Sequence, residues 1–211
     1  MTFSVKEIYF TLQGEGAQTG RAAVFARFAG CNLWSGREED RAGAACWFCD
    51  TDFIGVDGPG GGKFESARAL AEEVRRCWDV EATGGRPYVV FTGGEPMLQL
   101  NAALVDACHA LGLEVAIETN GTKPVPANVD WVCVSPKPGS ELVQRSGHEL
   151  KLVHPHEVEP DEVAALEFEH FFLQPLDGPD AAEHTARCID YCRRNPQWRL
   201  SLQTHKLVGI P

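Results

Sequence analysis

The sequence predicts an α/β fold in which all 211 residues form one domain, an open, partial barrel of (β/α)6 type. Short apolar strands alternate with amphipathic helices, which is typical of parallel strands joined by right-handed crossovers. Polar residues gather directly after the strands, at the edge where such sheets bind ligands. About six strand–helix units are too few to close an eight-stranded barrel, so we expect the sheet to stay open.

The strands are predicted from short runs of apolar residues. Most of these runs are apolar on both faces, as buried parallel strands are, whereas the first one alternates. A basic residue, Arg27, interrupts the second run. The predicted strands are residues 5–10, 22–28, 87–91, 113–117, 131–134, 149–153, 170–173 and 198–202.

The helices are predicted from apolar residues that recur at intervals of three and four. In the first helix Leu70, Val74 and Cys77 share one face, and Gly112 suits the end of the second helix. Residues 29 to about 62 contain many glycines and acidic residues and are predicted to form a loop. The predicted helices are residues 65–78, 97–111, 161–166 and 181–194.

Charge and terminal composition exclude several classes of protein. The chain has 19 Lys+Arg and 30 Asp+Glu, a formal net charge of −11. Such a surface repels phosphate backbones, so we expect no nucleic-acid partner. No stretch approaches the ~18 apolar residues of a membrane span, and the N-terminus does not resemble a secretory signal. We therefore expect a cytoplasmic protein with reduced thiols and no membrane partner.

Eight cysteines are present, and three of them stand apart in the loop after the strand 22–28. Cys31, Cys46 and Cys49 have the spacing C-x14-C-x2-C. Zinc sites usually need four ligands, so a zinc-binding module stays an alternative only if a distant residue contributes the fourth. Three thiolates suit a 4Fe–4S cluster with one iron left open. The other five are predicted to be core thiols: Cys77, Cys108, Cys133, Cys188 and Cys192.

Two further features indicate a ligand site. Thr92-Gly93-Gly94-Glu95-Pro96 ends the strand 87–91, where its glycines allow a ligand to approach the backbone and Glu95 can accept from an ammonium group. Arg27 lies among apolar residues and needs an anionic partner. That partner is either an acidic side chain of the protein or the carboxylate of a ligand.

Together, the three cysteines, Phe48 before the last of them, and Gly93-Gly94-Glu95-Pro96 resemble the radical S-adenosylmethionine (SAM) superfamily, whose usual spacing is C-x3-C-x2-C. The longer first gap resembles one branch of the 7-carboxy-7-deazaguanine synthase family of queuosine biosynthesis. That second resemblance runs from about residue 5 to the C-terminus. It is carried by residues 12–16, 27–34, 49–52, 118–121, 135–137 and 203–206.

The resemblance implies a radical SAM barrel of reduced size and a carbon–nitrogen lyase. Such an enzyme converts 6-carboxy-5,6,7,8-tetrahydropterin to 7-carboxy-7-deazaguanine with loss of ammonia. A 5′-deoxyadenosyl radical removes hydrogen from C6, Mg²⁺ assists the ring contraction, and no side chain is assigned to the chemistry. The implied cofactors are a 4Fe–4S cluster, SAM and Mg²⁺, and the implied partners are a flavodoxin-type reductant and a second subunit in a homodimer. An activase that forms a glycyl radical on a partner protein is the alternative enzyme.

The resemblance also assigns residues. Cys31, Cys46 and Cys49 would bind the cluster and Thr51 would bind Mg²⁺, whereas His154, His156 and His184 are expected on the surface. The SAM-binding residues would be Phe48, Cys49, Asp50, Gly94, Glu95, Ser135, Pro136, Lys137, Gln174, Pro175, Leu176 and Asp177. The substrate-binding residues would be Leu12, Gln13, Gly14, Arg27, Thr92, Glu118 and Pro211.

Overall fold

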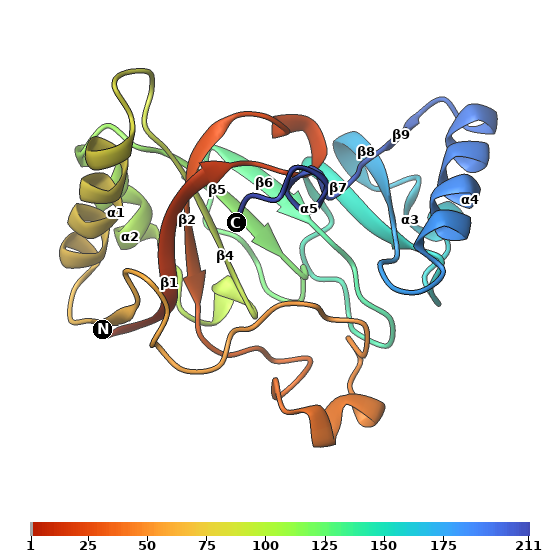
Figure 1. Cartoon of the computed structure of the whole chain (residues 1–211), viewed down its shortest axis with the longest axis horizontal. Helices are drawn as coiled ribbons and strands as arrows, with labels where there is room; N and C mark the ends of the chain where they lie inside the picture. The colour runs from red at the N-terminus through yellow and green to blue at the C-terminus, as the bar shows by residue number, and fades with distance from the viewer. Residues whose placement is uncertain (1) are drawn as a thin grey trace.

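A computed structural model describes residues 2–211 as a single open sheet flanked by helices (Figure 1). Its nine strands follow the order β3-β1-β2-β4-β5-β6-β7-β8-β9, and from β2 to β9 all neighbours are parallel. The predicted open α/β sheet is therefore confirmed. The strands are β1 (Phe3–Leu12), β2 (Ala22–Phe28), β3 (Gly62–Phe64), β4 (Tyr88–Gly93), β5 (Glu114–Thr119), β6 (Trp131–Val134), β7 (Ser146–His154), β8 (Glu167–Pro175) and β9 (Trp198–Leu200).

The sheet departs from the predicted parallel pattern at β1. This strand pairs antiparallel with both β2 and β3, with Glu7 opposite Arg27. A crossover between parallel neighbours needs a dozen or more residues, usually with a helix. The segment between Leu12 and Ala22 is shorter than that, so the two strands form a hairpin. Strand β3, which lies between the predicted loop and the predicted helix 65–78, was not predicted.

The helices also differ from a regular repeat. The segment predicted as one helix over 97–111 is divided, because Asn101 caps a new helix by accepting from the Leu104 amide at 3.1 Å. No helix separates β5 from β6 or β6 from β7. The helices are α1 (Ala67–Glu81), α2 (Ala102–Ala110), α3 (Pro160–Val163), α4 (Ala181–Arg194) and α5 (Thr204–Val208), with 3₁₀ turns η1 (Gly16–Gln18), η2 (Glu38–Gly43) and η3 (Pro96–Leu98).

The core lies between the parallel strands and the helices α1, α2 and α4. On α1, Leu70 and Val74 are fully buried. In the sheet, Phe28 of β2 stacks on Phe91 of β4 with ring centroids 5.7 Å apart. Burying each such side chain stabilises the fold by roughly 1.5–3 kcal/mol. Among the five predicted core thiols, Cys108, Cys133 and Cys188 are buried, while Cys77 and Cys192 are half-buried.

Two long segments lie against the carboxyl ends of the strands. One is the cysteine-containing loop after β2, and the other is the C-terminal segment with α5, which Figure 1 shows in front of the sheet. Within residues 2–211, no helix has the length and apolar character needed to cross a membrane.

Candidate active site

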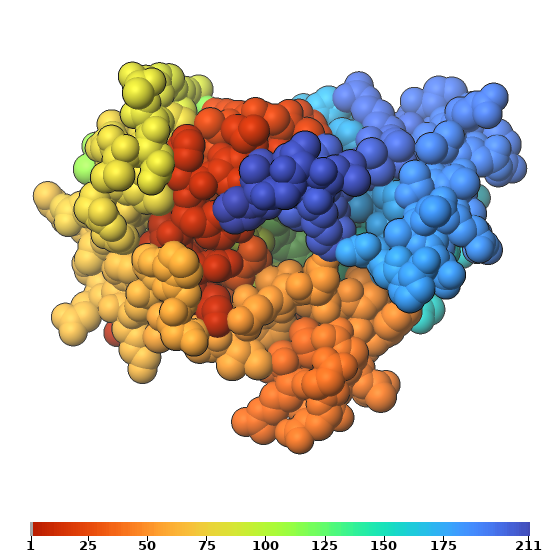
Figure 2. Space-filling model, in the orientation of Figure 1, coloured from red at the N-terminus to blue at the C-terminus, as the bar shows by residue number. Residues whose placement is uncertain are grey.

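A cavity of about 410 Å³ occupies the carboxyl edge of the sheet. Its walls are β1 and the residues after it, the ends of β2, β4, β5, β7 and β8, the segment after β6, the cysteine loop and the C-terminal segment. Figure 2 shows the corresponding hollow between the orange loop and the dark blue C-terminal segment. The volume falls within the range of sites for small molecules and cofactors.

All three clustered cysteines line this cavity. The long gap between Cys31 and Cys46 forms η2, whose Arg41 stacks over the Trp34 ring at 4.2 Å. Arg41 also donates to the carbonyl oxygens of Trp47 and Cys49, at 2.8 and 2.9 Å. The inserted residues therefore hold the turn that carries the last two cysteines, a role that the sequence did not reveal.

Within the described residues, the three thiols do not gather around the position of a single metal ion. Among residues 2–211, no three His, Cys, Asp or Glu side chains are close enough to share one metal ion, as a zinc centre requires. A 4Fe–4S cluster instead holds each cysteine on a different iron. Burial raises the pKa of Cys31, while a hydrogen bond from Cys46 lowers the pKa of Cys49 and favours its thiolate, the ligating form.

In the turn after β4, Gly94 lines the cavity, whereas Glu95 does not. Gly94 lines the cavity, and a Cβ there would lie 2.3 Å from the Gly30 carbonyl oxygen, so only glycine fits. The Glu95 side chain is fully buried and accepts from Thr119 Oγ1 at 2.7 Å and from the amides of Met97 and Asn120 at 2.8 Å. The expectation that Glu95 faces a ligand therefore does not match its position, because its oxygens join the turn to β5.

Of the other expected SAM-binding residues, Pro136 is buried outside the cavity lining. Within the lining, Ser135 accepts from Lys137 Nζ at 2.5 Å. The remaining residues of this group all contribute to the lining: Phe48, Cys49, Asp50, Gln174, Pro175, Leu176 and Asp177.

Phe48, which lines the cavity, packs against a histidine ring. The His156 ring stacks on Phe48 with centroids 5.5 Å apart, and Lys137 Nζ lies 5.9 Å from the same ring. Burial, together with Lys137, lowers the pKa of His156 to about 4. The expectation that His154 and His156 lie on the surface is wrong, since both are half-buried where the chain leaves β7; His184 is half-buried too, with Nδ1 2.8 Å from the Leu176 carbonyl oxygen.

The C-terminal segment, residues 203–211, lines one side of the cavity and is held there by polar contacts. Lys206 Nζ lies 2.7 Å from Asp50 Oδ2 and 2.5 Å from Asp177 Oδ2. Thr11 Oγ1 donates to the Pro211 oxygen at 2.8 Å, and the Thr204 hydroxyl donates to the Gly14 carbonyl oxygen at 2.7 Å. The matched motif Gln203-Thr204-His205-Lys206 therefore joins the cysteine loop to the start of the chain, although none of its residues was predicted to form the site.

The expected substrate-binding residues share the cavity with the cysteines: Leu12, Gln13, Gly14, Arg27, Thr92, Glu118 and Pro211 all line it, as does Thr51. Arg27 is opposite Thr92 in the sheet register, and Phe91 is opposite Ile117, which places Glu118 beside Thr92. Arg27 and Glu118 therefore lie at one level, on strands separated only by β4.

Arg27 pairs with an acidic side chain of the protein and also lines the cavity, so its position is compatible with both partners considered from the sequence. Its Nε donates to Glu7 Oε1 at 2.8 Å and its guanidinium donates to the Tyr9 hydroxyl at 3.2 Å. The side chain is only 16% exposed, and it still lines the cavity. The internal ion pair orients the guanidinium without removing it from the ligand site.

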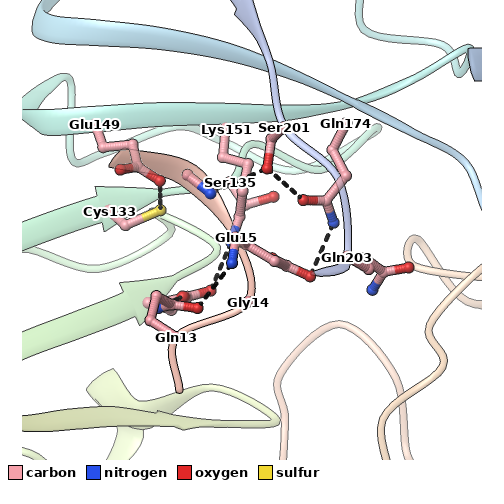
Figure 3. A network of polar contacts seen from close by, with 12 residues as sticks. Gln13, Gly14, Glu15, Cys133, Ser135, Glu149, Lys151, Gln174, Ser201 and Gln203 are labelled. Carbon is pink, nitrogen blue, oxygen red and sulfur yellow. Dashed lines mark hydrogen bonds and ion pairs between the residues drawn. The ribbon is translucent and has the colours of Figure 1, made fainter. Parts of the chain in front are cut away.

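A polar network opposite Arg27 includes two residues that were not predicted. Lys151 Nζ contacts both Glu15 and Glu118, and Gln13 and Gln174 donate to the same carboxylates (Figure 3). Lys151 stands between two leucines in the predicted strand 149–153, which also contains Glu149. Unlike Arg27, it is therefore not the single charged residue of an apolar run, and no sign of a second buried cation was present in the sequence.

The open sheet and its three-cysteine cavity define a radical SAM enzyme. The Radical SAM superfamily profile matches residues 42–150. The crystal structure of QueE from Escherichia coli superposes with a TM-score of 0.69 and 29% identity, over 97% of this chain and 95% of that one.

Within that class, the relatives identify the family. The chain is 64% identical over 212 residues to the 7-carboxy-7-deazaguanine synthase of Bordetella pertussis (strain Tohama I), with all of both chains covered. It is 61% identical over 211 residues to the one of Bradyrhizobium diazoefficiens, again with full coverage. The chain belongs to the 7-carboxy-7-deazaguanine synthase family.

Proposed function

We propose that this chain forms 7-carboxy-7-deazaguanine from 6-carboxy-5,6,7,8-tetrahydropterin with loss of ammonia, using a 4Fe–4S cluster, SAM and Mg²⁺. The observation that carries the proposal is that one cavity brings Cys31, Cys46 and Cys49 together with Arg27 and Glu118. The relatives named above support the same activity.

In this proposal the cysteines bind the cluster, and residues at the strand ends bind SAM. Cys31, Cys46 and Cys49 would hold the cluster, which when bound supplies the electron for reductive cleavage of SAM. Gly94 packs against the Gly30 backbone and lines the cavity, and Lys137 offers an ammonium group to a carboxylate. These residues would bind and orient the amino-acid end of SAM, and Phe48 would offer an aromatic face beside it.

The substrate would lie across β2, β4 and β5. Adjacent strands are about 4.8 Å apart, so the backbones at Arg27 and Glu118 stand roughly 10 Å apart, with β4 between them. Arg27 would bind the carboxylate of the pterin, and Glu118 and Gln13 would bind the N–H groups at the other end. Thr51 would offer its hydroxyl to Mg²⁺, with water and the substrate carboxylate completing the oxygen ligands.

The finer partner assignments rest on the family resemblance. A flavodoxin-type protein would supply the electron, two copies of the chain would form the assembly, and the enzyme would act in the cytoplasm. Acid-rich composition is consistent with a small free substrate and not with nucleic acid.

A direct assay tests the proposal. Anaerobically reconstituted protein is incubated with SAM, Mg²⁺, a chemical reductant and 6-carboxytetrahydropterin, and the products are identified by mass spectrometry. We expect 7-carboxy-7-deazaguanine in an amount that depends on the pterin. Cleavage of SAM without this product would overturn the proposal and favour another radical SAM enzyme, such as a glycyl-radical activase. The cover formed by residues 203–211 argues against an activase, which needs an open groove for a peptide.

A further inference from the structure

Lys151 is a buried cation in the wall of the cavity. Its side chain is 4% exposed, and its neighbours Leu150 and Leu152 are fully buried on the other face of β7. Burying an ammonium group is costly unless hydrogen bonds and opposite charges surround it. Its partners therefore show what the residue does.

Those partners form a symmetrical arrangement around Nζ. Glu118 Oε2 lies 2.8 Å from Lys151 Nζ, and Glu15 Oε2 is its second contact. An amide holds the other oxygen of each carboxylate: Gln13 Nε2 donates to Glu118 Oε1 at 2.8 Å, and Gln174 Nε2 donates to Glu15 Oε1 at 3.0 Å. Figure 3 shows Glu15, Lys151 and Gln174 converging between the strand ends. Each carboxylate is thus fixed at both oxygens.

The arrangement leaves an excess of negative charge. Burial alone would lower the pKa of Lys151, but Glu118 and Glu15 raise it well above its ordinary value. Burial alone would raise the pKa of Glu15, but Lys151 lowers it. Two carboxylates and one ammonium group sum to −1, so this wall suits the N–H donors of a ligand. Without the ammonium group, the two half-buried carboxylates would repel each other and lose their alignment.

We propose that Lys151 is a positioning residue for the pterin: it holds the carboxylates of Glu15 and Glu118 aligned, so that this wall accepts the N–H edge of the ring while Arg27 holds the carboxylate. The inference rests on the proposed function. It assigns Lys151 no part in SAM binding, because Lys151 contacts neither the cysteine loop nor the turn after β4 among its described partners.

The test measures ligand binding. The variants Lys151→Met and Lys151→Arg are reconstituted anaerobically with cluster and Mg²⁺, and calorimetry gives the Kd of SAM and then of 6-carboxypterin, an oxidised analogue. For Lys151→Met we expect a 10- to 100-fold weaker Kd for 6-carboxypterin, the range for loss of charge-assisted hydrogen bonding, and a SAM Kd within about twofold of wild type. Lys151→Arg keeps the charge and should recover part of the loss. Lys63→Met, at an exposed position of β3, is the matched control and should change neither Kd.

The outcomes separate the two proposals. If the wild-type protein does not bind 6-carboxypterin, the proposed function fails. If the wild type binds it and Lys151→Met binds equally well, only the role of Lys151 fails. Equal weakening of SAM and pterin binding by Lys151→Met would also overturn that role, because it indicates a general structural defect. If Lys151→Met does not fold, Lys151→Gln, which also lacks the charge, takes its place: a Kd for 6-carboxypterin raised no more than the Kd for SAM refutes the inference.

Discussion

Arg27 of β2 faces Glu7 of β1 across an antiparallel pair, and its Nε lies 2.8 Å from Glu7 Oε1. The hairpin therefore supplies an internal counter-ion that keeps the guanidinium extended along the cavity wall before any ligand arrives. A side chain that is already ordered loses less conformational entropy when it binds a carboxylate.

Arg27→Ala should raise the Kd for 6-carboxypterin by about 10- to 100-fold, because a charge-assisted hydrogen bond is lost. The Kd for SAM should change less than about threefold. Calorimetry on the reconstituted protein measures both. Arg21→Ala is the control: Arg21 directly precedes the same strand, pairs with Glu114 at 2.8 Å and is outside the cavity lining. Equal losses for SAM and pterin would give Arg27 a structural role.

Replacing Cys31, Cys46 and Cys49 together by Ala should abolish cluster binding, since these thiols are the ones that line the cavity. Wild-type protein reconstituted anaerobically should contain about four irons per chain and be brown. Iron analysis and visible absorption measure the change. Cys192→Ala, in a half-buried position on α4, should leave the iron content unchanged. Iron retained by the triple variant would contradict the assignment of ligands.

Thr51→Ala should increase the Mg²⁺ concentration needed for half-maximal turnover, because the variant lacks the hydroxyl proposed as a metal ligand. A titration of initial rate against Mg²⁺ measures it. Thr19→Ala removes an exposed hydroxyl of the β1–β2 connection and should leave the titration unchanged. Identical Mg²⁺ curves for wild type and Thr51→Ala would remove Thr51 from the metal site.

His156 should make the fold sensitive to mild acid. Its pKa of about 4 lies below the ordinary value of 6.5, so the unfolded chain binds a proton at a pH where the folded protein does not. The associated stability is complete above pH 6.5 and is lost as the pH falls towards 4. At about 1.4 kcal/mol per pKa unit, this cost is about 2 kcal/mol at pH 5.

His156→Phe keeps a ring against Phe48 and has no group to titrate. Calorimetric melting at pH 7.5 and pH 5 should therefore show a smaller fall in melting temperature for the variant than for wild type. His148→Phe is a control because His148, which stacks on Trp131 at 4.9 Å, lies away from Phe48. The same fall for wild type and His156→Phe would show that His156 does not contribute.

Local pattern predicted the parts of the fold that depend on local sequence. The strand β2 and the helix α4 lie where hydrophobic periodicity placed them. The direction of β1 depends on the length of the following connection, and β3 exists only because the loop returns to pair with β1. Pairing between distant segments leaves no periodic signal in either one.

The parts of the site that consist of short sequence motifs could be predicted from the sequence. The cysteine spacing identified the loop, and the glycines after β4 mark a real close approach of backbones. The burial of Glu95 could not be predicted, because an acid next to two glycines has the same local pattern whether it faces a ligand or the core. Lys151 and Lys206 were missed because their partners are distant in sequence and meet only in the folded chain.

The hydrogen bond from Thr11 to Pro211 joins residues 200 positions apart, and the segment 203–211 follows every strand in the chain. Because N-terminal parts of a chain fold first during synthesis, the cysteine loop emerges from the ribosome before its cover exists. We therefore expect an interval during translation in which a cluster can be delivered from the side that is later closed. Ribosome-bound chains stalled before residue 203 should accept a cluster from a donor protein faster than released chains do, and equal rates would contradict this order of assembly.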